Sequence, residues 1–79
     1  MDIQEIEREV ASLIEGIILT RVDDDALLIE SGLIDSLSAV DVALAVERRF
    51  GCKIPPTEID LHLESVKVLA AYIAEHSRS

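Results

Sequence analysis

Aliphatic residues recur at spacings of three and four along most of this chain, which restricts it to packing amphipathic helices. The first series is Ile3, Ile6, Val10, Leu13, Ile14 and Ile17. Asp2, with Glu5 three residues later, is typical of a helix N-terminus, and Gly16 offers a stop. The sequence therefore predicts a first helix over about residues 2–16.

The same spacing predicts a second long helix from Ser36 to near Arg49. Asp35 is its expected N-cap, and Phe50 with Gly51 is expected to close it.

Two further helices follow. The prolines at 55 and 56 force extended backbone before a short helical turn over about residues 56–61. Ser65 is a good N-cap for a last helix. The residues expected to face inward on it are Val66, Leu69, Tyr72 and Ile73, with residues 75–79 fraying into solvent.

Composition supports a small helical bundle. Half of the 79 residues are apolar, yet there is one Phe, one Tyr and no Trp, so the core must be aliphatic. Alternating segments joined by a hairpin turn, which would indicate strands, are missing. We expect one all-α domain over residues 1–79, a four-helix bundle of three main helices and one short helix with a long first connection.

Net charge limits the partners. A formal charge of −9 argues against nucleic acid and anionic membranes, since both require clustered Lys and Arg. No stretch approaches the roughly 20 apolar residues that span a bilayer. The lone Cys52 cannot form an internal disulfide, and the N-terminus lacks the features of a secretory signal. We expect a cytoplasmic monomer with protein partners and no membrane insertion.

The connection over residues 17–35 is long for a compact domain, so it is either functional or disordered. Its apolar residues favour an ordered loop pinned to the core: Leu27, Leu28, Ile29, Leu33 and Ile34. The acidic run 23–25 fails as a calcium loop, because Leu27 and Leu28 would occupy positions that need a ligand and a glycine. Cys52 is interpreted as a small packing residue and His62 as a surface or helix-end residue.

Placing residues every 100° around the helix that starts at Ser36 separates two apolar stripes. The core stripe is Ala39, Val42, Ala43, Val46 and Phe50, and the second stripe is Leu37, Val40 and Leu44. Two explanations remain open for the second stripe. The long connection covers it, as is usual on monomers, or it is a docking patch rimmed by Asp41, Glu47 and Arg48.

Ser36 also has two explanations. A serine at a helix start most often caps a backbone N–H. A serine nucleophile needs an adjacent base, and the two histidines, His62 and His76, lie in the late connection and at the chain end. The chain therefore cannot activate its own serine, although a second enzyme could modify it.

The segment Gly32-Leu-Ile-Asp-Ser-Leu37, followed by Val40, Glu47 and Phe50-Gly51-x-x-Ile54-Pro55, resembles the signature of acyl carrier proteins. The close match covers about residues 30–59, and the helix layout extends it to the whole chain. The resemblance implies an acyl-carrier-like bundle in which Ser36 bears 4′-phosphopantetheine, with Asp35 as the family's acid before the serine. The chain would then carry a thioester and catalyse nothing itself.

The resemblance also implies partners. These are a phosphopantetheinyl transferase that uses coenzyme A, an adenylating ligase or acyltransferase that loads the arm, and a downstream acyl-accepting enzyme. The residues that match the family's recognition helix are Leu37, Val40, Asp41, Leu44 and Glu47. Residues 36–50 carry no net charge, which departs from the acidic recognition helices of fatty-acid carriers.

The approach to the serine gives a clue to the cargo. Gly32-Leu-Ile-Asp-Ser36 is one residue longer than the Gly-x-Asp-Ser usual in fatty-acid carriers. Together with Pro55-Pro-Thr-Glu-Ile-Asp60 it is similar to D-alanyl carrier proteins, which favours an aminoacyl carrier. The alternatives are a carrier for fatty-acid or polyketide synthesis and an unmodified helical module that binds a partner helix.

Overall fold

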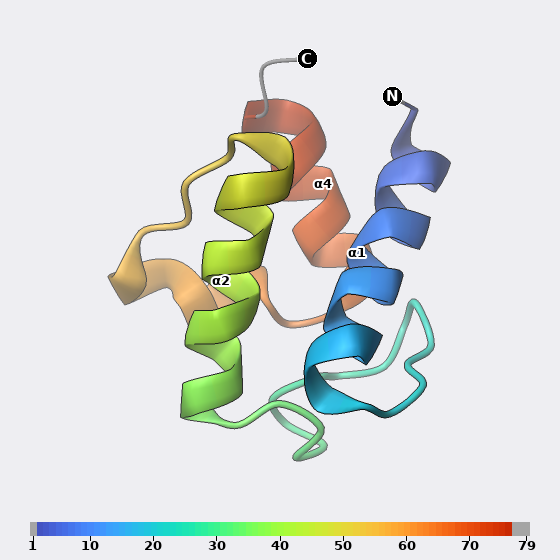
Figure 1. The fold of residues 1–79 in the computed structure, drawn as a ribbon, viewed down its shortest axis with the longest axis vertical. Helices are drawn as coiled ribbons and strands as arrows, with labels where there is room; N and C mark the ends of the chain where they lie inside the picture. The colour runs from blue at the N-terminus through green and yellow to red at the C-terminus, as the bar shows by residue number, and fades with distance from the viewer. Residues whose placement is uncertain (1, 77–79) are drawn as a thin grey trace.

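Helices make up the whole regular structure of residues 2–76, the part of the chain that the computed structural model describes (Figure 1). They are α1 (Ile3–Ile18), α2 (Ser36–Phe50), the 3₁₀ turn η1 (Pro56–Glu58), α3 (Ile59–His62) and α4 (Val66–His76). This confirms the predicted all-α bundle of three main helices and one short helical segment. Residues 77–79 of the predicted frayed end lie outside the described residues.

α1 lies against both α2 and α4 in the bundle (Figure 1). Its buried face consists of Ile6, Val10 and Ile14, with Leu13 and Ile17 half-buried beside them. Ile3 differs from the expected stripe, because it is the first residue of the helix and 42% exposed. At that end the Asp2 carboxylate accepts the Glu5 N–H at 2.9 Å, which confirms Asp2 as the N-cap.

The predicted stop of α1 at Gly16 is wrong. The helix continues to Ile18 and ends at Leu19, which adopts the left-handed conformation with φ of 58°. Ile17 and Ile18 are half-buried against the core, and this packing extends the helix by two residues past the glycine. A glycine inside a helix costs about 1 kcal/mol relative to alanine, which the packing of two isoleucines can offset.

The connection between α1 and α2 is ordered, as its apolar residues predicted. Leu28 and Ile34 are fully buried, and the Ile34 N–H donates to the Leu28 carbonyl at 2.9 Å. Leu28 also donates its N–H to the Glu64 carbonyl at 2.9 Å, which ties the connection to the turn before α4. The connection thus passes beneath the ends of the long helices and delivers the chain to the start of α2 (Figure 1).

One residue that was expected to hold the connection on the core is exposed, and one that was not expected to do so is buried. Leu27 is 42% exposed, so it does not hold the loop. Val22 takes such a role instead: its side chain is buried, and its N–H donates to the Glu15 carboxylate at 3.1 Å. Helical spacing could not identify Val22, because it lies outside any helix among acidic and polar neighbours.

The caps of α2 and α4 follow the sequence. Asp35 caps α2 by accepting the Ser38 N–H at 2.8 Å. At the other end Gly51, with φ of 67°, donates its N–H to the Glu47 carbonyl at 2.9 Å. The Ser65 hydroxyl accepts the Val68 N–H at 3.2 Å and caps α4.

α2 shows the two faces that its spacing predicted. Every residue of the core stripe is buried: Ala39, Val42, Ala43, Val46 and Phe50. Leu37 is 79% exposed, Val40 47% and Leu44 48%. The connection therefore does not cover the second stripe, and one face of α2 makes the core while another faces solvent.

Truncation of the two faces should have different effects on stability. Val46→Ala removes buried methyl groups and should lower the free energy of unfolding by about 2 kcal/mol. Leu44→Ala removes a larger but half-exposed group from the same helix and should cost less than about 1 kcal/mol. Urea unfolding of both variants measures this. Equal losses would contradict the assignment of the two faces.

The Asp35 cap should make stability depend on pH. Hydrogen bonds from the Ser38 backbone and hydroxyl lower the pKa of the Asp35 carboxyl. A lowered pKa stabilises the fold at pH values above the unfolded pKa of about 3.9, and this contribution is lost as pH falls through the folded value. Asp35→Asn retains a cap without titrating. The stability advantage of the wild type over this variant should therefore shrink between pH 6 and pH 2.5 in urea unfolding, and an advantage that stays constant over this range would refute the charged cap.

Candidate functional site

Ser36 occupies the first turn of α2 with its side chain exposed. Within the described residues its hydroxyl makes no hydrogen bond, since the cap position one residue earlier belongs to Asp35. The capping explanation for Ser36 therefore fails. Its hydroxyl is open to solvent at the end of the helix where backbone N–H groups are unpaired.

Asp35 does not provide the base that a serine nucleophile would need. Its carboxylate is held by donors from Ser38, first the backbone N–H and then the hydroxyl, and by the Leu37 N–H. These hydrogen bonds lower its pKa, which makes it a weaker base. Asp35 shapes the helix end and leaves Ser36 unactivated.

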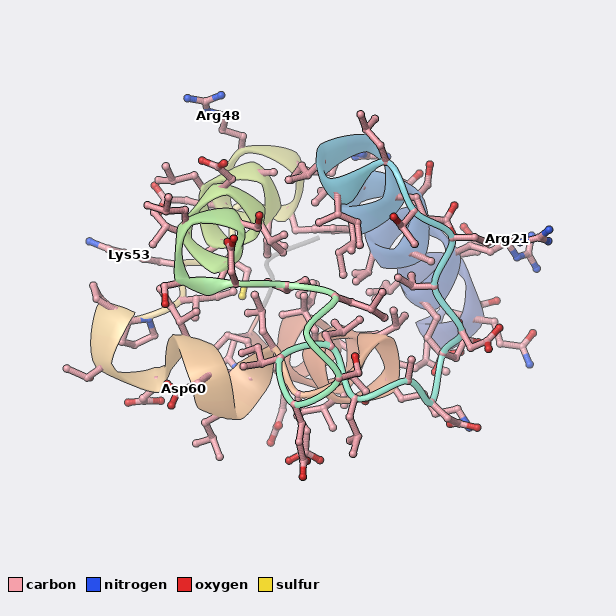
Figure 2. All side chains as sticks on the ribbon, turned by 90° about the horizontal axis from the view of Figure 1, so that it is seen from below. Arg21, Arg48, Lys53 and Asp60 are labelled. Carbon is pink, nitrogen blue, oxygen red and sulfur yellow. The ribbon has the colours of Figure 1, made fainter. Side chains whose placement is uncertain are left out.

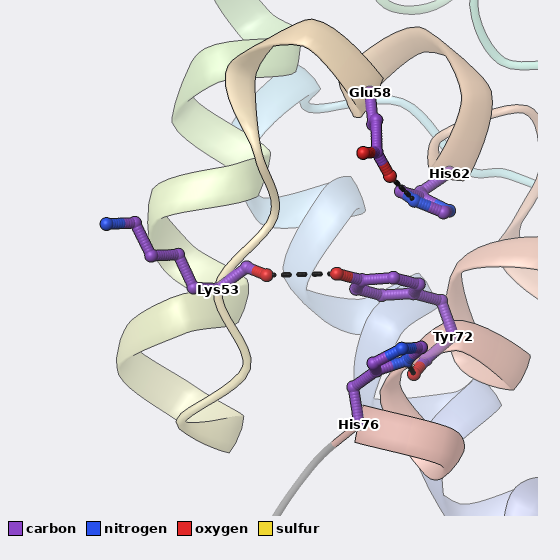
Figure 3. Close-up of polar contacts among 5 residues, drawn as sticks. All are labelled: Lys53, Glu58, His62, Tyr72 and His76. Carbon is purple, nitrogen blue, oxygen red and sulfur yellow. Dashed lines mark hydrogen bonds and ion pairs between the residues drawn. The ribbon is translucent and has the colours of Figure 1, made fainter.

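The two histidines belong to a separate cluster around Tyr72 (Figure 3). The His62 and His76 rings pack on Tyr72 with centroid separations of 3.9 and 4.2 Å. His62 Nε2 lies 2.9 Å from Glu58 Oε1, and the Tyr72 hydroxyl donates to the Lys53 carbonyl at 3.1 Å. The cluster holds α3 and the segment before it against α4, so its role is structural.

The sequence did not indicate this cluster. His62 does end α3, as expected, but its side chain is only 16% exposed. The i,i+4 spacings of Glu58 with His62 and of Tyr72 with His76 were the signals that could have found each half. Their meeting depends on how α3 packs on α4, which local spacing does not specify.

A hollow of about 380 Å³ opens beside Ser36, between α2, the connection and the η1–α3 segment. Its lining is Ile29, Asp35, Ser36, Ala39, Val40, Pro56, Ile59 and Asp60. Figure 2 shows Asp60 on α3, next to the N-terminal end of α2. Neither histidine lines this hollow.

These residues suit a phosphopantetheine group. A phosphodiester on the Ser36 oxygen would lie at the N-terminus of a 15-residue helix, where unpaired N–H groups and the helix dipole favour an anion. The hollow next to it presents aliphatic side chains to the methyl and methylene groups of the arm. Ser36 is itself one of the residues that line this hollow.

The second stripe of α2 lies alongside. Leu37, Val40 and Leu44 are its exposed members, and Asp41, Glu47 and Arg48 are exposed around them. Arg49 belongs elsewhere, because it pairs with Glu9 of α1 at 2.8 Å. Figure 2 shows Arg48 on the α2 side of the molecule and Arg21 on the opposite side.

The acidic run 23–25 lies apart from this site in the connection, where Lys67 Nζ approaches the Asp25 carboxylate at 3.4 Å. Among residues 2–76, no three potential metal ligands gather. Within the same residues, no helix combines the length and apolarity needed to cross a bilayer. Cys52 is buried, in agreement with a packing role, and burial raises the pKa of its thiol.

One known relative is a D-alanyl carrier protein of Bacillus velezensis. It is 44% identical to this chain over 36 residues, which are 46% of this chain and 46% of the relative. The match thus spans about half the length of that protein.

A family-level match covers far more of the chain. Residues 5–73 match the family described as "Phosphopantetheine attachment site". This range contains all the helical segments from the first turn of α1 through most of α4. The resemblance to the acyl carrier protein family is confirmed, and so is the expectation of a covalent phosphopantetheine cofactor. The chain belongs to the phosphopantetheine attachment site family of carrier domains.

Proposed function

We propose that this chain carries an aminoacyl group as a thioester on a 4′-phosphopantetheine arm attached to the Ser36 oxygen. The observation that carries the proposal is the division of roles at the start of α2. Asp35 satisfies the helix end, so the adjacent Ser36 hydroxyl is exposed and has no partner in the described residues. A hydroxyl with no structural task, at a helix end that favours phosphate, supports its use as the attachment point.

Attachment requires a second enzyme. A bond forms between the Ser36 oxygen and the phosphorus of the pantetheine phosphate of coenzyme A, and the bond from that phosphorus to the nucleotide part breaks. We assign the hydroxyl proton to a base of the transferase, because neither histidine lines the hollow and the adjacent Asp35 carboxylate is engaged by Ser38. Once attached, the arm supplies a terminal thiol that forms thioesters.

The exposed stripe of α2 supports a docking role for partner enzymes. Leu37, Val40 and Leu44 present aliphatic side chains next to Ser36, where a transferase or a loading ligase must approach. Asp41, Glu47 and Arg48 form a rim of mixed charge, so apolar burial contributes more to binding than electrostatic steering does. We propose that the transferase, an adenylating ligase and the downstream acceptor share this surface in turn, in the cytoplasm.

The aminoacyl cargo is supported by two observations. The relative from Bacillus velezensis is a D-alanyl carrier protein by name. The chain also has two residues between Gly32 and Asp35, a spacing that resembles D-alanyl carrier proteins, and one of them, Ile34, is fully buried. The longer approach to the serine is therefore part of the packed core. A carrier for fatty-acid or polyketide synthesis is the second candidate.

Modification should depend on Ser36 alone. Incubation of the chain with coenzyme A and a broad-specificity phosphopantetheinyl transferase should increase the intact mass by one phosphopantetheine group. Ser36→Ala should abolish the increase, while Ser38→Ala, two residues further along the same helix, should retain it. An unchanged wild-type mass, as the unmodified interaction module predicts, would overturn the proposal, and so would an equal gain on Ser36→Ala.

The stripe should matter for loading and little for folding. Leu44→Glu places a charge where the structure leaves the side chain 48% exposed, so we expect a fall in kcat/KM of the loading ligase of tenfold or more with a melting temperature within a few degrees of wild type. Ile3→Glu is the matched control, because Ile3 is 42% exposed on α1. Equal effects of the two variants on loading would argue against a docking surface on α2.

A further inference from the structure

One carboxylate at the hollow beside Ser36 has no structural task. Asp60 is exposed on α3 and lines the hollow, and its side chain makes no hydrogen bond or ion pair with the described residues. Asp35, the other acid of the lining, is already engaged by Ser38. Asp60 is thus the acid of this hollow that is free to bind something else.

The remaining lining limits what that ligand can be. Ile29, Ala39, Val40 and Ile59 supply an apolar floor, and no basic side chain lines the hollow. A second, smaller hollow shares Ile29 and Asp60 with the first, and its other lining residues are Leu27, Glu30 and Glu64. Asp60 therefore stands between two hollows whose charged lining residues are all acidic. Such surroundings favour a cationic group and oppose an anionic one.

The backbone position of Asp60 is restrained by packing of the residues that follow it. His62, two residues later, packs on Tyr72 and lies 2.9 Å from Glu58 (Figure 3). The next residue, Leu63, is fully buried. The contacts of His62 and Leu63 anchor the C-terminal end of the short α3 segment to the bundle. A carboxylate on an anchored segment can hold a ligand at lower entropic cost than one on a free loop.

We propose that the Asp60 carboxylate binds the ammonium group of an aminoacyl thioester when the arm on Ser36 folds back into this hollow. The inference rests on the proposed function, because the ligand is the cargo of that same arm. The apolar floor contacts the arm and the short side chain of the cargo. A long alkyl chain has no cationic group to pair with Asp60, and it would extend into the second hollow, which is lined by acidic side chains. The site therefore favours small aminoacyl groups over fatty acyl groups.

The most direct test measures the pKa of the cargo amine. The probe is a ¹⁵N-labelled alanyl group joined to pantetheine by an amide in place of the thioester. The transferase loads it onto the chain of residues 1–79 from its coenzyme A derivative. Contact with a carboxylate stabilises the ammonium form, so the amine pKa on the wild type should exceed that of the free alanyl-pantetheine by about 0.5 in an NMR titration. The increase should fall when salt is raised to about 1 M.

Matched variants distinguish the effect of contact with Asp60 on the amine pKa from the effect of the net charge of the chain. Asp60→Asn should return the amine pKa to nearly the value of the free probe. Glu75→Gln removes the same charge from an exposed position on α4 that lines neither hollow. The amine pKa of the probe on this variant should equal its value on the wild type. Equal amine pKa values on wild type and Asp60→Asn would overturn the inference, as would an equal decrease in Glu75→Gln.

A second readout tests the location of the cargo. The alanyl probe should shift the backbone amide resonances of Ile59 and Asp60 more than a propionyl probe that differs only by lacking the amine. Equal shifts from the two probes would contradict a contact at Asp60. Failure of the transferase to add either probe would instead refute the proposed function, so the two failures are distinguishable by mass.

Discussion

The cap at the start of α2 is the interaction on which the rest of the site depends. The Asp35 carboxylate accepts the Ser38 N–H at 2.8 Å, which fixes where the helix begins. Because the cap lies at residue 35, Ser36 falls in the first turn and its hydroxyl stays exposed. The same register sets the two faces of α2 and places the hollow beside the serine.

The remainder of the fold holds that helix end in place. Leu28 and Ile34 are buried in the connection, and backbone hydrogen bonds tie it to the turn before α4, so the approach to Asp35 has little freedom. On the other side of the hollow, the Tyr72 cluster anchors α3. A chain of 79 residues has a small core, and this one commits a single face of α2 to it. The other face remains available for partners.

The sequence predicted what depends on local spacing. The core stripe of α2, the caps at Asp2, Asp35 and Ser65 and the closing Gly51 all follow from residues close together in the chain. What it missed depends on tertiary packing. The burial of Ile17 and Ile18 carries α1 past Gly16.

At the site, the sequence indicated Ser36 and Asp35 and left open what covers Leu37, Val40 and Leu44. Their exposure depends on the path of the connection, which does not cover them in the folded structure and which helical spacing does not specify. The hollow is lined by residues of α2 and α3, and Ser36 and Asp60 in its lining are more than twenty residues apart in the sequence. Helical periodicity does not predict such a long-range contact. The family match over residues 5–73 identifies the cofactor as phosphopantetheine. The geometry alone indicates only that an anion is favoured at this helix end.

The central claim is that the Asp35 cap leaves Ser36 as the attachment point. Trypsin cleavage after Arg21 and Arg48 releases residues 22–48, which contain three serines, Ser31, Ser36 and Ser38. Fragmentation of this peptide from the transferase-treated chain in a mass spectrometer assigns the phosphopantetheine to one of them. The structure predicts that the added mass lies on Ser36 alone. Its appearance on Ser31 or Ser38 would contradict the account.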